Sequence, residues 1–228
     1  PMDLSIGGLW HAMGVPARIV LIVMVLMLFW CVYVAIERGL YFLTARGQSR
    51  ALAGAIGGPL KNWDVDAALK LIGGEAYKKA YLGAILGSAL KEYKDRPTAA
   101  GLKAAERSLD RVAVEEGAAM RKRMNSLATT GSPTPFVGLV GTIFGIINAF
   151  GMMAEAGGGD LTQISGGIAE ALVSTAVGII VAIIAIWFYN FFNALVDSVL
   201  KDIHVASAEL VDWIEKDQIR RGEVTAAK

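Results

Sequence analysis

The sequence predicts an all-α integral membrane protein with three transmembrane helices, of which the second and third extend into a cytoplasmic helical domain. Three apolar runs contain no charged residue: 19–36, 124–154 and 171–196, with lengths of 18, 31 and 26 residues. About 20 apolar residues are enough to cross a hydrocarbon core about 30 Å thick. The hydrophobic fraction of 54% also exceeds the roughly 45–50% that is usual for soluble domains.

The first apolar run is interpreted as a membrane helix at residues 15–37 that the mature protein keeps. Seventeen residues precede Arg18, the run is longer than the apolar core of a signal peptide, and no small-residue cleavage site follows it. Trp10 before the run and Trp30 near its far end are suited to the two membrane interfaces.

The distribution of charge predicts the orientation in the membrane. Residues 38–123 carry 16 basic and 9 acidic residues, whereas the connection from Glu155 to Glu170 carries three acidic residues and no basic one. Basic residues accumulate on the cytoplasmic side of membrane proteins, and those close to a span are the most informative. Because Arg121–Arg123 directly precede span two, we expect this end of span two inside the cell and the N-terminus outside it.

The segment between spans one and two has the pattern of cytoplasmic helices. Asp64 is suited to cap a short helix that ends at Gly73–Gly74. A second helix is expected from Glu75 to Lys94, because Pro97 and the residue before it disfavour its continuation.

Spans two and three are expected to extend beyond the membrane as long helices. From Pro97, apolar residues recur at three- and four-residue steps with no strong stop before Ser132–Pro133. The same spacing continues past Asp197 through Ile203 and Leu210. These extensions are expected to pack with the 38–123 segment.

The chain therefore divides into seven segments that alternate between the membrane and the two sides of it. They are an outward-facing N-terminal segment (1–14), transmembrane helix 1 (15–37), a cytoplasmic helical segment (38–126), transmembrane helix 2 (127–154), a short outer loop (155–163), transmembrane helix 3 (164–194), and a cytoplasmic C-terminal helix and tail (195–228).

Spans two and three carry small and polar residues at helical spacing, unlike span one. Small residues allow helix backbones to approach closely, which by itself accounts for the glycines. The close-packing candidates are Gly138, Gly141, Gly145 and Gly178, and the secondary candidates for a pore face are Thr134, Asn148 and Ser174.

Close packing does not account for Glu170. A carboxylate inside a span costs roughly 2.5–3.5 kcal/mol on insertion scales and usually faces a bundle interior or water. Glu170 lies only one or two turns from the outer loop, so a merely interfacial carboxylate is the alternative.

Two threonines give a second indication of a polar path. Counted from Gly158 near the middle of the outer loop, Thr142 lies 16 residues before and Thr175 lies 17 residues after. Antiparallel helices rise by about 1.5 Å per residue, so the two hydroxyls are expected at similar depth, near mid-membrane. Each could instead bond the carbonyl four residues back in its own helix. Beside a carboxylate, the matched pair favours a proton or cation path, which requires several copies or a partner helix.

These two spans also carry a family resemblance. The run TPFVGLVGTIFGI from Thr134 to Ile146 resembles the second-span signature of the MotA/TolQ/ExbB proton-channel family. The run IAEALVSTAVG from Ile168 to Gly178 resembles the third-span signature. Three spans with a large cytoplasmic insertion after the first resemble the ExbB/TolQ branch, because the flagellar stator branch has four.

The resemblance implies a homopentamer in the bacterial inner membrane around a dimer of ExbD/TolR-like single-span partners, each with an intramembrane aspartate. It implies that Thr142, Thr175 and Glu170 form the ion pathway and that the proton drives rotation about the partner dimer. It also implies a periplasmic N-terminus and a cytoplasmic C-terminus. No cofactor is expected, and sodium suits the hydroxyls and carboxylate less well than the proton does.

Other classes of protein have less support. A net charge of +1 gives no reason to expect a nucleic-acid partner. An enzyme is not expected, because His11 and His204 lack companions for a metal site and Cys31 has no nearby base. A passive membrane scaffold for envelope proteins is the main alternative, and a channel that conducts without a partner is another. The scaffold needs the glycines but neither the threonines nor Glu170.

Overall fold

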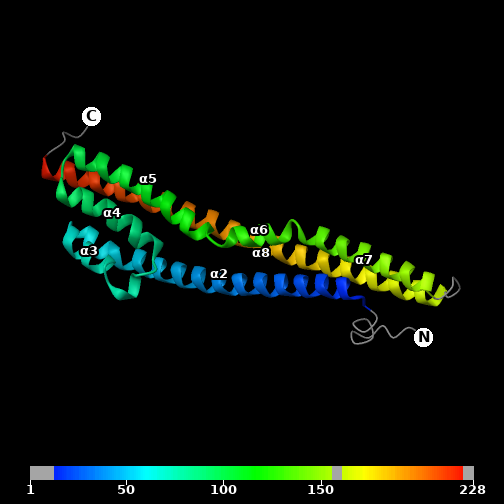
Figure 1. Cartoon of the computed structure of the whole chain (residues 1–228). Coiled ribbons are helices and arrows are strands. Elements are labelled where there is room, and N and C mark those ends of the chain that lie inside the picture. The colour runs from blue at the N-terminus through cyan, green and yellow to red at the C-terminus, as the bar shows by residue number, and fades with distance from the viewer. Residues whose placement is uncertain (1–12, 156–160, 223–228) are drawn as a thin grey trace. The chain divides into compact units, whose positions relative to one another are not determined.

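The computed structural model describes residues 13–155 and 161–222, and these residues form helices joined by short connections, with no strand among them. Figure 1 shows the helices in chain order. They are α2 (Val15–Lys61), α3 (Val65–Ile72), the single 3-10 turn η1 (Glu75–Tyr77), α4 (Tyr81–Asp95), α5 (Ala99–Arg121), α6 (Met124–Gly131), α7 (Thr134–Glu155) and α8 (Leu161–Arg221).

Three stretches of the described helices are long and apolar enough to cross a membrane. They lie in α2, in Met124–Ala154 across α6 and α7, and in α8 from Ser165 onward. The prediction of an all-α membrane protein with three spans is therefore confirmed.

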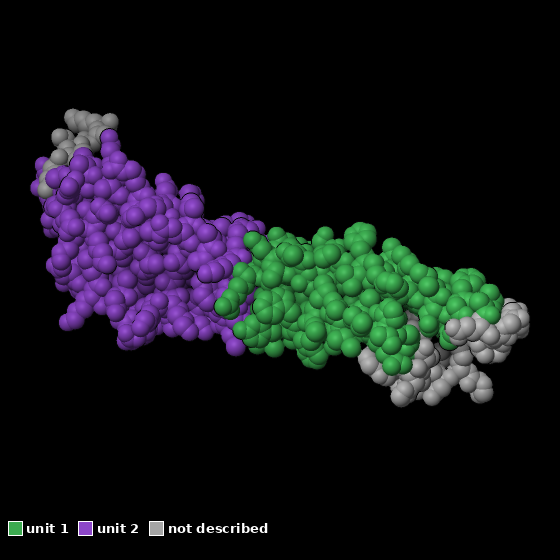
Figure 2. Space-filling model, in the orientation of Figure 1, with its two compact units in different colours: residues 1–36, 123–191 green, residues 37–122, 192–228 purple. Residues whose placement is uncertain are grey.

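The chain forms two compact units, which Figure 2 distinguishes by colour. The first unit contains residues 1–36 and 123–191, and the second contains residues 37–122 and 192–228. The division falls inside α2 and α8, so each of these two helices contributes residues to both units.

The first unit is a bundle of α2, α6, α7 and α8. Met24 and Cys31 of α2 are buried in it, and Gly131 of α6 lies so close to α8 that an added Cβ would be 2.7 Å from Ile186 Cγ1. Large apolar side chains such as Phe144 and Ile183 are exposed on its outside. This inversion of the usual pattern is what a lipid solvent permits, because burial of such side chains against protein gains little when the alternative is hydrocarbon.

The helix from Pro97 does not continue to Ser132–Pro133 as the sequence pattern suggested. α5 ends at Arg121, and Arg123 has a φ of 68°, in the left-handed region that few residues other than glycine adopt. α6 then starts at Met124 and ends at Gly131, so the expected stop at Ser132–Pro133 falls inside the second span, between α6 and α7.

The second unit packs α3, α4 and α5 with the later parts of α2 and α8. Its core consists of fully or almost fully buried apolar residues, including Leu52, Ile85, Leu90, Ile203 and Ile214. Hydrophobic burial of this kind is the main source of stability for helices that lie outside a membrane.

The short elements of the second unit agree in part with the sequence pattern. Asp64 caps α3 as expected, since its Oδ1 accepts a hydrogen bond from the Ala67 N–H at 2.8 Å, and the helix ends before Gly73. The expected helix from Glu75 to Lys94 is instead a 3-10 turn followed by α4 from Tyr81. The Gln48 side chain accepts the Lys79 N–H at 2.7 Å, which satisfies a backbone donor in the gap between them.

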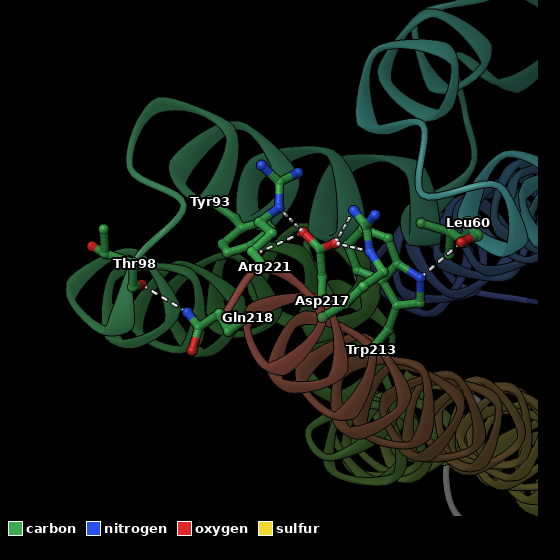
Figure 3. Close-up of polar contacts among 8 residues, drawn as sticks. Leu60, Tyr93, Thr98, Trp213, Asp217, Gln218 and Arg221 are labelled. Atoms are coloured by element: carbon green, nitrogen blue, oxygen red, sulfur yellow. Dashed lines mark hydrogen bonds and ion pairs between the residues drawn. The ribbon is translucent and has the colours of Figure 1, made fainter. Parts of the chain in front are cut away.

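The end of α8 is held by a buried carboxylate, shown in Figure 3. Asp217 is fully buried and accepts hydrogen bonds from the Tyr93 hydroxyl at 2.8 Å, from Arg220 Nη2 at 2.7 Å and from Arg221 Nε at 2.7 Å. One turn earlier, the Trp213 Nε1–H donates to the Leu60 carbonyl at 2.9 Å. These bonds connect α8 to α4 and α2 within the second unit.

Candidate functional site

The candidate site lies where α7 and α8 cross in the first unit. Thr142 on α7 and Thr175 on α8 are partly exposed, and their hydroxyl oxygens are in direct hydrogen-bond contact. The prediction that these two side chains lie at similar depth therefore agrees with the geometry. The structure brings together two hydroxyls that are 33 residues apart in the chain.

Glycines allow the contact by bringing the two backbones together. A Cβ added to Gly138 would lie 3.0 Å from the Ser174 carbonyl oxygen and 3.3 Å from Gly178 Cα. A Cβ added to Gly178 would lie 2.9 Å from the Thr134 carbonyl oxygen. A Cβ cannot be accommodated at such distances from backbone atoms unless the helices separate. These glycines thus fix the distance between α7 and α8 on one side of the threonine pair.

The same kind of contact lies on the other side of the pair. A Cβ added to Gly145 would lie 2.9 Å from Ala171 Cβ and 3.1 Å from Ala171 Cα. Thr142 is therefore placed between two points of close backbone approach, at Gly138 and at Gly145. Small residues at membrane helix contacts have this effect in general.

Two backbone carbonyls complete the polar cluster. Thr142 Oγ1 lies 3.1 Å from the Ala171 carbonyl oxygen and 3.3 Å from the Gly138 carbonyl oxygen. Thr175 Oγ1 lies 3.4 Å from the same Gly138 oxygen. The carbonyls of Gly138 and Ala171 are the ones four residues before Thr142 and Thr175, which the sequence offered as alternative partners. The contacts across the two helices, from Thr142 to Ala171 and from Thr175 to Gly138, were not anticipated.

The three secondary candidates for a pore face do not join this pair. Thr134 is fully buried, and its hydroxyl donates to the Thr130 carbonyl and contacts the sulfur of Met27 on α2. Asn148 packs beside Gly14, where an added Cβ would lie 3.1 Å from the amide group.

Ser174 is also fully buried, and its hydroxyl has no hydrogen-bond partner among the described residues. A Cβ added to Gly141 would lie 2.9 Å from Ser174 Cβ and 3.1 Å from Val20 Cγ1, so Gly141 faces both Ser174 and α2. Successive residues of a helix are about 100° apart, because each turn takes 3.6 residues. Thr142 and Thr175, one residue further along each helix, therefore lie on the side of the α7–α8 contact that faces away from α2.

Glu170 lies on α8, but its side chain falls outside the described part of the chain. At four-residue steps after Glu170 along α8 lie Ser174, Gly178 and Ala182, a stripe whose three residues are all buried inside the first unit. Thr175 is on a different side of α8 from this stripe.

The contact with α2 also locates the pair along the span. Val20 faces Gly141 and lies two residues after Arg18, where the charge-free run of α2 begins. The threonine pair is therefore near the loop end of that run and not at its middle, where Thr134 contacts Met27.

The chain is a helical membrane protein whose second and third spans are joined by hydroxyl side chains that hydrogen-bond across the helix contact. The chain belongs to the MotA/TolQ/ExbB proton channel family, whose family model matches residues 78–204. The matched region includes both threonines, and the resemblance noted from the two span signatures is confirmed.

Individual relatives agree with this assignment. The biopolymer transport protein ExbB of Pseudomonas putida is 37% identical over 119 residues, which are 52% of this chain and 36% of that protein. The Tol-Pal system protein TolQ of Haemophilus influenzae is 34% identical over 115 residues, 50% of each chain. The ExbB of Salmonella typhimurium is 41% identical over 90 residues, 40% of this chain and 37% of that protein. The chain thus matches half or less of the length of these relatives.

Proposed function

We propose that this chain is the proton-channel or stator subunit of an inner-membrane motor that is driven by the proton motive force and acts on the cell envelope. In this proposal several copies, five by family resemblance, surround a dimer of single-span partners with an intramembrane carboxyl group. Proton passage along the face of α7 and α8 turns the ring about the partner. The observation that carries the proposal is the hydroxyl pair of Thr142 and Thr175 at the glycine-lined contact of two spans.

The position of the pair supports an external partner. Its open side faces away from α2, so a polar group of another chain can reach it without displacing a helix of this unit. The oxygen atoms of the pair and the Gly138 and Ala171 carbonyls are the polar groups available there. One bundle of this size cannot enclose a path alone, which is why the proposal includes a ring of copies and a partner helix.

The role of each residue follows from its chemistry. Thr142 and Thr175 would hydrogen-bond the partner's carboxyl group or a water on it. Glu170 would attract protons at the outer entrance, as its place near the acidic outer loop suggests. Each elementary charge that crosses 100 mV releases about 2.3 kcal/mol, so several steps could drive repeated conformational work.

The first test is purification from the native membrane, native mass spectrometry and identification of the proteins that co-purify. We expect a ring with a single-span partner that has a carboxyl group inside its span. Proton flux through the same complex in vesicles should be lost when Thr175 is replaced by valine, while the assembled mass is unchanged. An assembly of this chain with no such partner would contradict the proposal, and so would an unchanged proton flux in the Thr175→Val variant.

A passive scaffold is the second candidate, because the close glycine contacts between α7 and α8 would pack the bundle whether or not ions pass along it. It differs from the motor in one measurable respect. A scaffold keeps its cellular function in an assembled Thr175→Val variant, whereas the motor loses it.

A further inference from the structure

A pocket of about 400 Å³ lies in the second unit between α2, α4 and α5. It is found where the 3-10 turn η1 has ended at Tyr77 and α4 has not yet begun. Its volume is within the range of roughly 300–1,000 Å³ that small-ligand sites occupy. We call it the tyrosine pocket, because its aromatic and charged lining consists of Tyr41, Tyr77, Tyr81, Lys78, Lys79 and Glu116.

Glu116 of α5 is a half-buried acid without a counter-ion. None of the described residues forms a hydrogen bond or an ion pair with its carboxylate. Burial, together with the negative charge of Glu115, raises the pKa of Glu116 above its ordinary value of 4.5. Lys78 does not neutralise it, since Lys78 Nζ lies 3.6 Å from Glu75 Oε1 instead. Acidic residues that are removed from water are ordinarily paired, so this carboxylate is suited to a ligand that carries a positive charge.

The tyrosine rings favour the same kind of ligand. A cation within about 6 Å of an aromatic ring is attracted by the negative face of the ring. The Tyr81 hydroxyl donates to Asp202 Oδ2 at 3.2 Å, which fixes a ring that lines the pocket. The Arg38 guanidinium carbon lies 5.0 Å from the centre of the Tyr41 ring, so one aromatic face in this part of the unit already contacts a cation. A carboxylate among such rings indicates a site for an ammonium group.

The lysines add a site for a negative charge. Lys78 and Lys79 are exposed and line the same pocket. The Lys79 N–H donates to the Gln48 side chain at 2.7 Å, which holds the backbone that carries both lysines against α2. Lys79 Nζ has no ion-pair partner in the part of the chain that the structure describes. A lysine ammonium binds phosphate as a point charge. The pocket therefore offers one group for a cation and one for a phosphate.

The tyrosine pocket lies at the level of the membrane surface. The charge-free run of α2 ends at Ile36, and Tyr41 follows five residues later, at most about 7.5 Å further along the helix axis. The headgroup layer on each side of the hydrocarbon core is about 5–8 Å thick. Leu40 and Leu43, which precede and follow Tyr41 in α2, are 62% and 74% exposed, as side chains that contact acyl chains would be.

We propose that the tyrosine pocket binds the headgroup of a zwitterionic phospholipid with a primary ammonium group, of the phosphatidylethanolamine type. The ammonium group donates hydrogen bonds to the Glu116 carboxylate among the tyrosine rings, and the phosphate accepts from Lys79. The acyl chains lie against Leu40 and Leu43. This site is separate from the contact between α7 and α8 and does not rest on the proposed function.

Two other headgroups fit less well for chemical reasons. A phosphatidylglycerol headgroup has no cation, so its phosphate would meet Lys79 but leave Glu116 unpaired. A phosphatidylcholine headgroup carries a quaternary ammonium, which the rings attract but which has no N–H to donate to Glu116.

The test is native mass spectrometry of the full chain, stripped of lipid in detergent and titrated with these three phospholipids, all with identical acyl chains. We expect the first phosphatidylethanolamine to bind about tenfold more tightly than either of the others, as hydrogen bonds to charged groups allow. Glu116→Gln should abolish this preference. The variant keeps the shape of the side chain and removes a charge that burial disfavours, so we expect it to fold.

Each variant has a matched control. Glu115→Gln removes the same charge from the adjacent exposed residue, which is not part of the pocket, and should keep the preference. Lys79→Met should weaken binding of all three lipids, because each has a phosphate. Lys91→Met on the exposed surface of α4 should weaken none of them.

Every other outcome overturns the proposal. Equal binding of the three lipids, or an equal loss in Glu115→Gln and Glu116→Gln, would show that the pocket does not recognise the ammonium group. Glycerophosphoethanolamine, which has the headgroup but no acyl chains, should displace the lipid only at much higher concentration. Displacement at equal concentration would assign the pocket to a soluble ligand. Binding of no lipid above the detergent background would show that the pocket is closed in the assembly by a second copy.

Discussion

Two adjacent hydroxyl residues of α8 have opposite environments. Thr175 shares hydrogen bonds with Thr142 and a backbone carbonyl, whereas Ser174 is fully buried with no partner for its hydroxyl among the described residues. A buried polar group without a partner carries a desolvation penalty of about 1–3 kcal/mol. The small side chain, not the hydroxyl, accounts for the fit of Ser174 against Gly141.

We therefore expect Ser174→Ala to leave the stability unchanged or to raise it by up to about 1 kcal/mol, because the penalty disappears with the oxygen. Thermal unfolding of the full chain in detergent measures the difference. Thr134→Val is the matched comparison, since its buried hydroxyl is bonded to the Thr130 carbonyl, and it should lower stability by about 1 kcal/mol. A clear loss of stability in Ser174→Ala would show that its hydroxyl has a partner such as a bound water.

Counting along the sequence was enough to pair the two threonines. Helices of equal rise on either side of one loop place residues at equal distances from it next to each other, and Thr142 and Thr175 obey this rule. The face on which each polar residue lies was not predictable in the same way. Thr134 and Ser174 share helical spacing with the glycines, but only the position of α2 shows that they are buried in the first unit, while half-buried Asn148 packs beside Gly14.

The contact between α7 and α8 depends on glycines, which leave no side chain between the two helix backbones. Gly138→Ala would place a methyl group 3.0–3.3 Å from backbone atoms of α8, which cannot move separately from the helix. We expect a loss of about 2 kcal/mol in stability, as in other overpacked contacts, together with separation of the threonine pair.

Gly151→Ala is the control on the same helix, because an added Cβ there meets nothing within 4 Å. It should be neutral or stabilising by up to about 1 kcal/mol through helix propensity. Unfolding in detergent measures both variants. Equal effects of the two would show that propensity, and not the contact, determines the response at Gly138.

The Asp217 cluster was missed in the sequence, although a signal was present. Apolar positions of α8 recur at Ile203, Leu210 and Ile214, and Asp217 is the next residue on this buried stripe. An acidic residue at such a position indicates a buried carboxylate with partners. The break at Arg123 had no comparable signal, since neither glycine nor proline stands there and only tertiary contacts can impose its left-handed backbone.

The bonds at Asp217 predict a dependence of stability on pH. Burial alone would raise the pKa of Asp217, but hydrogen bonds from Arg220, Tyr93 and Arg221 outweigh it and hold the pKa below its ordinary value of 3.8. A carboxyl group with a lowered pKa in the folded state stabilises fully above the ordinary value, and the contribution is lost as pH falls through the folded value. Amide-exchange protection at the end of α8 should therefore decrease at pH below about 4.

Asp217→Asn should remove that pH dependence and lower the stability of the second unit by about 2 kcal/mol, because the arginines lose a buried anion but stay partly in water. Amide exchange of the full chain in detergent measures both effects. Asp212→Asn breaks an exposed pair with Lys216 and should change stability by less than about 1 kcal/mol. An unchanged pH profile in Asp217→Asn would show that another group titrates.

At the scale of the whole molecule, the orientation in the membrane is open to a direct test. Cys31 is buried in the first unit, so it gives little background in thiol labelling. In the proposed orientation a membrane-impermeant maleimide added to intact spheroplasts should label Gly158→Cys in the loop and not Lys103→Cys on α5. Both should react after the membrane is opened. The reverse pattern would place the second unit outside the cell and would contradict the charge argument.

The depth of the threonine pair has an electrical consequence. Val20 places the pair close to the end of the charge-free run of α2, on the side of the loop. In the proposed orientation, a proton that enters from outside crosses only a small fraction of the voltage drop before it reaches the hydroxyls. Most of the field then lies between the pair and the cytoplasm. Membrane voltage would therefore act mainly on the transfer of the proton from the pair to the cytoplasm. The acidity of the outer compartment would determine how often a proton reaches the pair.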